Sequence, residues 1–247
     1  MQKQELPELT KDELKRFGLK MLQPRDGYRF TLDPLLLCDF ASHGNESLIA
    51  DLGSGTGVMA LVMARIAKGA LIYAIEQDNF AAGLAEKNLH LNDLSEQVKV
   101  INDDILNVRR RLPVSSCDLV LSNPPYRKRG RGRLNLDPGK MAARHETTAG
   151  ISDFISAAKY LVKPGGRICM VYHPARLPEF MAAAAEQKLA VLRLRMVHGV
   201  ADAAAKVFLV ELGKGRKIGD TEVMPPLVVR SDGENYTDEV RKILLGK

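Results

Sequence analysis

A glycine-rich turn, followed by acidic residues at the ends of later apolar segments, is the group of residues best suited to chemistry. The stretch DLGSGTG places Asp51 two positions before the first of the glycines Gly53, Gly55 and Gly57. Glycines between a strand and a helix adopt positive φ and let the backbone approach a ligand closely. Gly55 and Gly57 also match the dinucleotide fingerprint loosely, but Asp51 would repel a pyrophosphate. The carboxylate instead suits the ammonium of a zwitterionic ligand.

Two further acidic residues follow the next two apolar segments. Glu76 ends ALIYAIE, where a carboxylate could accept two hydrogen bonds from a ribose diol, and Asp104 in NDDIL could accept one from an exocyclic amine. Each acid alone is more often a helix N-cap. Three acids at successive strand ends beside a glycine turn together predict a site for S-adenosylmethionine.

A fourth segment, LVLSNPPYRKRGRGRLN, ends on Asn123-Pro124-Pro125-Tyr126 and continues into a cationic stretch. Neither proline has an N–H to donate, so the chain must leave the sheet here. The result is a stiff backbone that holds an amide and an aromatic ring together, although a plain strand exit has the same pattern.

Composition sets the class of protein. The chain has 247 residues, 45% of them hydrophobic and 27% charged, as in an ordinary globular protein, and a net charge of +6. No apolar run approaches the roughly 20 residues that span a bilayer, and the N-terminus does not resemble a signal peptide. We expect a cytoplasmic protein without a metal, whose cysteines, Cys38, Cys117 and Cys169, are core thiols.

Apolar runs alternate with helical patterns from residue 47 onward. This order predicts an α/β fold, doubly wound around a mostly parallel seven-stranded sheet, in which ligands lie beyond the carboxyl ends of the strands. We expect a helix over 151–166 that a Pro-Gly-Gly stop ends, strands over 190–200 and 205–215, and a terminal helix. We also expect a single domain over 1–247, with an N-terminal extension (1–45) on the substrate side of a catalytic core (46–247).

With these residues in place, the chain resembles the class I methyltransferases, which have a Rossmann-like fold. GYRFTLDPLLLCDFA, NPPY, ARHE, YLVKPGGRICMVYHPARLPE and the tail segments PPLVV and YTDEV further resemble the bacterial tRNA1(Val) adenine N6-methyltransferase family. The resemblance implies an enzyme that methylates the exocyclic amine of an adenine in RNA, in the anticodon loop of a tRNA. For the oligomeric state, which the sequence does not determine, we favour a monomer.

The resemblance also implies roles for the Asn-Pro-Pro-Tyr residues. The side-chain oxygen of Asn123 and the carbonyl of Pro124 would accept the two amine hydrogens, and Tyr126 would stack on the base, which is worth about 1–3 kcal/mol. The target base must be unpaired or turned out of its stack. Asn123 would also border the cofactor. We expect RNA phosphates to contact Arg127, Lys128, Arg129, Arg131, Arg133 and Arg144.

Other interpretations remain open. Glutamine N5-methylation of a protein uses a similar motif, and a nucleic-acid-binding protein with a vestigial methyltransferase fold is the alternative from another class. Asp33 could cap its helix or close over the methionine part of the cofactor. Arg144 and His145 suit a loop over the site, the run Arg109–Arg111 suits either phosphate or solvent, and His173 is expected to end a strand without catalysing a reaction.

Overall fold

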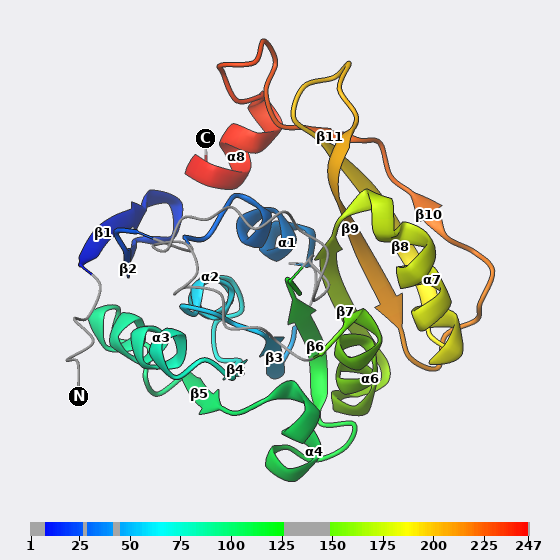
Figure 1. The fold of residues 1–247 in the computed structure, drawn as a ribbon, viewed down its shortest axis with the longest axis horizontal. Coiled ribbons are helices and arrows are strands. Elements are labelled where there is room, and N and C mark those ends of the chain that lie inside the picture. Colours follow the sequence, from blue (N-terminus) through cyan, green and yellow to red (C-terminus); the bar gives the residue numbers. More distant parts are fainter. Residues whose placement is uncertain (1–7, 27–28, 42–44, 126–148, 247) are drawn as a thin grey trace, which may run out of the picture.

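The computed structural model describes residues 8–26, 29–41, 45–125 and 149–246. A single sheet of nine strands, in the order β10-β8-β9-β7-β6-β3-β4-β5 with β11 also paired to β8, runs through the described part of the chain (Figure 1). The neighbouring strands β3 to β7 are parallel, and β9 runs antiparallel to both β7 and β8. The bounds of the seven long strands are Leu48–Leu52 (β3), Leu71–Glu76 (β4), Val98–Asn102 (β5), Cys117–Ser122 (β6), Val162–Tyr172 (β7), Ala190–His198 (β8) and Ala205–Gly213 (β9).

This is the predicted mostly parallel α/β sheet, with two short additions. The strands β10 (Glu222–Val223) and β11 (Leu227–Val228) lie along β8 and lengthen the sheet beyond the expected seven strands. Two-residue strands are too short to have a periodicity of their own, so no sequence pattern predicts them. No helix in the described ranges is long and apolar enough to cross a membrane.

Helices cover both faces of the sheet (Figure 1). One apolar core gathers residues of α1, α2, α3 and α8 against one face, and the other gathers residues of α4, α6 and α7 against the opposite face. Because α1 and α2 are apolar nearly all round, each must be covered on its outer side as well, and α8 does this for α1. The helix bounds are Asp33–Ala41 (α1), Val58–Ile66 (α2), Asn79–Leu91 (α3), Val108–Arg111 (α4), Ile151–Leu161 (α6), Leu177–Glu186 (α7) and Asp238–Leu245 (α8), with short 3₁₀ turns at Lys15–Phe17 (η1), Ile105–Asn107 (η2) and Pro174–Arg176 (η3).

The expected Pro-Gly-Gly helix stop belongs to a strand instead. Helix α6 ends at Leu161, and β7 starts at once with Val162 and contains the Pro-Gly-Gly run. A Cβ on Gly166 would lie 2.8 Å from a Val162 methyl and 2.9 Å from the Asp118 carbonyl oxygen. The pairing of β6 with β7 shifts register at this position. The glycine is therefore needed for close contact between strands, so the prediction of a helix over 151–166 is wrong in its last turn.

An N-terminal β-hairpin, β1 (Leu9–Leu14) and β2 (Leu19–Pro24), was not expected from the sequence. The side-chain amides of Asn88 on α3 and of Asn92, the residue that caps the end of α3, both donate to and accept from the backbone of β2, at Leu22 and Lys20 respectively, over 2.7–3.1 Å. Each asparagine thus takes the place of a neighbouring strand's peptide group. These bonds hold the hairpin against α3.

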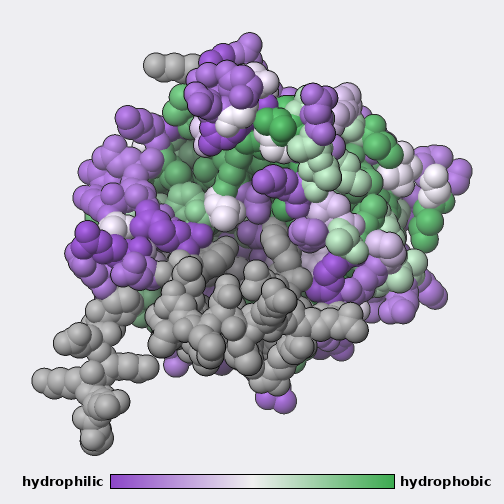
Figure 2. Space-filling model, turned by 45° about the horizontal axis from the view of Figure 1, so that its top comes forward, coloured by the Kyte–Doolittle hydropathy of each residue, from purple (hydrophilic) through white to green (hydrophobic). Residues whose placement is uncertain are grey.

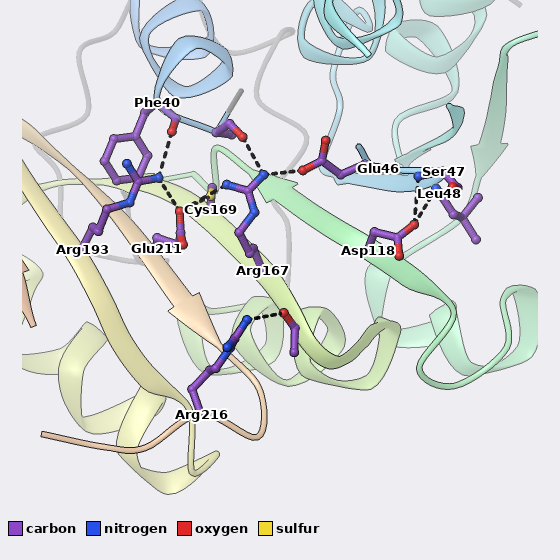
Figure 3. Close-up of polar contacts among 12 residues, drawn as sticks. Phe40, Glu46, Ser47, Leu48, Asp118, Arg167, Cys169, Arg193, Glu211 and Arg216 are labelled. Atoms are coloured by element: carbon purple, nitrogen blue, oxygen red, sulfur yellow. Dashed lines mark hydrogen bonds and ion pairs between the residues drawn. The ribbon is translucent and has the colours of Figure 1, made fainter. Parts of the chain in front are cut away.

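A buried ionic network fixes the end of α1 on the sheet (Figure 3). Glu211 of β9 is 6% exposed and accepts hydrogen bonds from Arg167 of β7 and Arg193 of β8. Arg193 also donates to the Phe40 carbonyl at 3.2 Å, and Arg167 donates to the Ala41 carbonyl at 2.9 Å. The last carbonyls of α1 thereby gain the cationic partners that a helix C-terminus favours.

Candidate functional site

The glycine turn lies between β3 and α2, as predicted. Gly53, Gly55 and Gly57 all have positive φ, at 72°, 56° and 85°. A Cβ on Gly57 would lie 3.1 Å from the Cβ of Ala85 on α3, so a larger residue would separate the turn from that helix. The turn therefore needs glycine for both conformation and packing.

A continuous chain of hydrogen bonds joins the carboxyl ends of four neighbouring strands. The Ser122 hydroxyl at the end of β6 donates to the Leu52 carbonyl of β3 at 2.7 Å. The backbone N–H groups of Gly53 and Ser54 donate to the Ile75 carbonyl of β4 at 2.9 and 3.0 Å. The Asn102 side chain at the end of β5 donates to the Glu76 carbonyl at 2.9 Å. The predicted site residues that follow these strands are thus held at one edge of the sheet.

Asp51 is the most unusual residue of this edge. It is 0% exposed, and neither of its carboxylate oxygens makes a hydrogen bond of normal geometry within the described residues. Burial raises its pKa from 3.8 to about 8, and the charge of Glu76 adds to the rise, while the backbone N–H of Ala60 opposes it in part. A buried carboxylate without a partner is costly in the absence of a ligand.

The Ser54 hydroxyl is also buried without a partner. In the described parts of the chain, the buried side-chain polar atoms without a hydrogen bond are Asp51 Oδ1, Asp51 Oδ2 and Ser54 Oγ. All three lie within four consecutive residues, 51–54, at the junction of β3 and the glycine turn. Buried polar groups in proteins nearly always have partners, so three orphaned atoms together indicate a polar ligand. Ser54 stands inside the DLGSGTG motif, but the sequence assigned it no role.

Glu76 is the last residue of β4 and is hydrogen-bonded to the glycine turn. Its two carboxylate oxygens accept hydrogen bonds at 2.8 Å, one from the Gly55 N–H and one from the Asp78 N–H. Burial raises the pKa of Glu76, and these two donors oppose the rise. Each oxygen retains a lone pair for a hydroxyl donor. The side chain is thus both oriented and able to bind a diol.

Asp104 has the N-cap role that was its alternative interpretation. Its Oδ1 accepts from the Leu106 N–H at 2.9 Å and begins η2. The cap uses one oxygen, so Oδ2 can still address a ligand. The neighbouring Asp103 is committed elsewhere, since Asn107 and Arg111 both donate to it and lower its pKa.

Asn123 and Pro124 follow β6 directly, next to the glycine turn, because Ser122 pairs with Leu52 in the sheet. Asn123 is partly exposed, Pro124 is buried and Pro125 is exposed. The remaining predicted substrate residues lie outside the described residues: Tyr126, Arg127, Lys128, Arg129, Arg131, Arg133, Arg144 and His145. Their roles stay predictions.

Other residues that the sequence analysis considered lie in helices, strand ends or the core, and several of them contact other parts of the protein. Arg111 pairs with Asp103, and the Arg109 guanidinium lies 5.2 Å from the Tyr160 ring centre. Asp33 is the first residue of α1, and His173 follows the end of β7 and accepts from the Ala175 N–H through Nδ1. The three cysteines are buried and free, as predicted. Among the described residues, no cluster of His, Cys, Asp and Glu could hold a metal ion.

Asn88 is a site-supporting residue that sequence reasoning missed. Besides the β2 backbone, its amide donates to the Thr56 carbonyl in the glycine turn at 3.1 Å, and the residue is 0% exposed. It therefore couples the N-terminal hairpin to the turn. An asparagine in the middle of the amphipathic pattern NFAAGLAEKNLHLN, on its buried face, was the available signal.

Known proteins with similar folds are methyltransferases. A predicted O-methyltransferase from Agrobacterium tumefaciens superposes with a TM-score of 0.69 at 23% identity, over 87% of this chain and 96% of that one. TYW2 from P. horikoshii, solved in complex with MeSAdo, superposes with a TM-score of 0.59 at 17% identity, over 84% of this chain and 72% of that one. At these identities the likeness shows the class I methyltransferase fold.

Sequence similarity is more specific. The profile of the methyltransferase small domain family matches residues 33–191. A tRNA1(Val) (adenine(37)-N6)-methyltransferase of Aeromonas hydrophila is 30% identical over 208 residues, which cover 83% of this chain and 84% of that protein. The matched region contains the glycine turn, all three acidic residues and Asn123. The chain therefore belongs to the methyltransferase small domain family and, within it, to the tRNA1(Val) adenine N6-methyltransferase family.

Proposed function

We propose that this methyltransferase uses S-adenosylmethionine to methylate the exocyclic amine of an adenine in the anticodon loop of a tRNA. The observation that carries the cofactor assignment is the group of three orphaned polar atoms on Asp51 and Ser54. They border the glycine turn, in which a Cβ on Gly55 would meet no atom within 4 Å and the Gly55 N–H donates to Glu76. The A. hydrophila relative is named for the same reaction at adenine 37.

The residues present fit the cofactor. The Asp51 carboxylate would bind its ammonium, the Ser54 hydroxyl its polar amino-acid end, Glu76 its ribose diol and Asp104 its adenine amine. An ammonium beside Asp51 would compensate the buried charge and lower the raised pKa. When bound, S-adenosylmethionine supplies an electrophilic methyl group.

Asn123 and Pro124 would present the substrate amine. The lone pair of an adenine amine is delocalised into the ring, so the amine is a poor nucleophile. Hydrogen bonds from its two hydrogens, one to the Asn123 side-chain oxygen and one to the Pro124 carbonyl, favour a pyramidal nitrogen. Pro124 is buried, its ring fixes its φ, and Pro125 after it restricts its ψ, so its carbonyl is held in place. This chemistry needs positioning and no base before transfer, since water can take the acidic product proton.

Other parts of the chain would contribute to substrate binding. We propose that residues 1–45 contribute to the substrate side, because β2 is joined through Asn88 to the glycine turn. Tyr126 would stack on the target base, and the cationic residues after it would contact RNA phosphates. The three buried free cysteines support a reducing cytoplasm.

The test is to incubate the protein with bulk tRNA and S-adenosylmethionine labelled on its methyl group. The label is then separated into RNA and protein, and the RNA is digested to nucleosides. The proposal requires label in N6-methyladenosine. Label found only in protein would favour the glutamine alternative. Cofactor binding without transfer to any RNA or protein would favour a vestigial fold.

A further inference from the structure

A concave site lies at the same edge of the sheet as Asn123. It is a groove of about 460 Å³ between the start of α1, the end of β8, the start of β9 and the segment after β11. The ends of β6 and β7 and the start of β9 share this edge because β9 pairs antiparallel with β7, Phe208 opposite Tyr172. Strands are about 4.8 Å apart, so the groove, beside β9 and β8, lies roughly 10–15 Å from Asn123. A few nucleotides of a single strand can span that distance.

The groove has an apolar floor and a cationic rim. Its floor includes Leu36, Val197 and Val207, which are 1–5% exposed. Its charged lining residues are Lys206, Arg230 and Asp33, two cations and one acid. On the face shown in Figure 2, hydrophobic residues are visible between hydrophilic ones in the upper half. An apolar floor with cations above it suits a base or ribose whose phosphate meets the rim.

The two cations are available to a ligand. Lys206 is exposed, and its ammonium makes no hydrogen bond or ion pair with any described residue, although its side chain lies against Gly199. The Arg230 guanidinium is held 4.7 Å from the Tyr236 ring centre, and its NH1 donates to the Glu234 carbonyl. The Arg230 backbone N–H donates to the Gly199 carbonyl at 2.9 Å, which fixes this rim to the end of β8. Arg230 therefore keeps further N–H donors in a preorganised position.

A groove of similar volume lies at the opposite edge of the sheet and can be compared with the groove that contains Lys206 and Arg230. About 440 Å³ in volume, it is lined by Lys163, Arg167 and Arg216 together with Glu46 and Asp118. Two of its three cations pair with carboxylates: Lys163 with Asp118 at 2.8 Å, and Arg167 with Glu46. Arg216 donates to the Gly165 carbonyl at 3.2 Å, much as Arg230 donates to the Glu234 carbonyl. It lies at the amino ends of the strands, far from the glycine turn, and so provides a matched control.

We propose that the groove with Lys206 and Arg230 binds a nucleotide of the substrate RNA that flanks the target adenine. The two cations contact backbone phosphate, and the apolar floor contacts the base or ribose. This inference rests on the proposed function. It adds a second point of attachment, made of residues that the Asn-Pro-Pro-Tyr motif and its basic extension do not include.

The experiment measures binding of an unmodified, fluorescently labelled tRNA transcript over a series of KCl concentrations. Lys206→Gln combined with Arg230→Gln is expected to weaken binding several-fold. The slope of log affinity against log salt should fall by about 1.4–1.8, the value for two lost phosphate contacts. Arg216→Gln is the control and should leave both unchanged. Lys206→Arg should retain the wild-type slope, because it keeps the charge.

The outcomes separate this inference from the proposed function. If the wild-type protein methylates the transcript but the double variant binds it with the wild-type slope, the groove does not contact RNA and the inference is wrong. An equal loss in Arg216→Gln would show a general effect of net charge, which also overturns it. Affinity for S-adenosylmethionine, measured by calorimetry, should be the same in all variants and verifies that they are folded. Failure of the wild-type protein to methylate RNA would instead overturn the proposed function.

Discussion

The backbone N–H of Gly55 donates a 2.8 Å hydrogen bond to Oε2 of Glu76, so the second acidic residue of the site also holds the glycine turn in place. A second bond, from the Asp78 N–H to Oε1, fixes the other oxygen. The carboxylate is thus oriented before any ligand arrives. Preorganisation of this kind reduces the cost of binding.

Glu76→Ala should weaken S-adenosylmethionine binding by at least tenfold. Hydrogen bonds to a charged group are worth about 1.5–3 kcal/mol each. The variant loses the hydrogen bonds between the carboxylate and the ribose, and it also loses the hydrogen bond from the Gly55 N–H that holds the turn. Calorimetry measures the affinity. Asp103→Ala is the control, since Asn107 and Arg111 occupy that carboxylate. Equal affinities of wild type and Glu76→Ala would remove Glu76 from the site.

Asp51→Asn should stabilise the ligand-free protein while it abolishes cofactor binding. The folded pKa of Asp51, about 8, lies above its ordinary 3.8, so the folded state binds the proton more tightly than the unfolded state. Stability of the wild type therefore falls as pH rises from about 4 to about 8, and the variant lacks this loss.

Thermal melts without ligand provide the test. An unsatisfied buried group costs about 1–3 kcal/mol, and 1 kcal/mol shifts Tm by about 2–4 °C in a protein of this size. The variant should melt roughly 2–12 °C above wild type at pH 8.5 and gain less at pH 5. S-adenosylmethionine should raise Tm only in the wild type. A variant less stable than wild type at pH 8.5 would show that Asp51 has a partner in the ligand-free protein.

Asn88→Ala and Asn92→Ala should differ in their effect on the cofactor. Both asparagines hold β2 on α3, but only Asn88 also bonds to the Thr56 carbonyl of the glycine turn. Both variants should lose roughly 1–3 kcal/mol of stability, the cost of unpaired buried polar groups. Only Asn88→Ala should also weaken S-adenosylmethionine binding. Equal affinities in the two variants would mean that the hairpin and the turn are not coupled.

Glu211→Ala should be strongly destabilising. Arg167 and Arg193, whose side chains are 18% and 17% exposed, would lose their shared partner and remain mostly buried. Removing one partner of a buried pair costs about 3–5 kcal/mol. Urea denaturation should show a smaller loss for Asp118→Ala, because that carboxylate is only partly buried. A loss below that of Asp118→Ala would mean that the network does not hold α1 on the sheet.

The sequence predicted the parts of the fold that periodicity determines. The alternation of apolar runs located β3 to β9, and glycine spacing located the turn after β3. The β1–β2 hairpin was missed because its attachment depends on the side chains of Asn88 in α3 and Asn92 just after it, which no local pattern of residues 9–24 reveals. The Pro-Gly-Gly run was misassigned because Gly166 serves contact with β6, a feature of tertiary packing.

The positions of the candidate site residues could be predicted where residue type and strand ends coincide. Asp51 lies near the end of β3, Glu76 ends β4, and Asp104 and Asn123 come just after β5 and β6; these four strands are parallel and adjacent in the sheet. Their roles stay predictions. The sequence could not predict that the Ser54 hydroxyl is buried without a hydrogen-bond partner among the described residues, because this depends on how the rest of the fold covers it. The hydrogen bond from Ser122 to Leu52 likewise depends on the register between β6 and β3.

The most direct test of the central claim is methyl transfer by Asn123→Ala. Nucleoside mass spectrometry after incubation with unmodified tRNA would quantify N6-methyladenosine, and calorimetry would measure S-adenosylmethionine affinity in the same preparation. We predict that N6-methyladenosine falls to background while cofactor affinity stays within about twofold of wild type, a difference below 1 kcal/mol. N6-methyladenosine formed at the wild-type rate would contradict the assignment of Asn123 as the residue that presents the adenine amine.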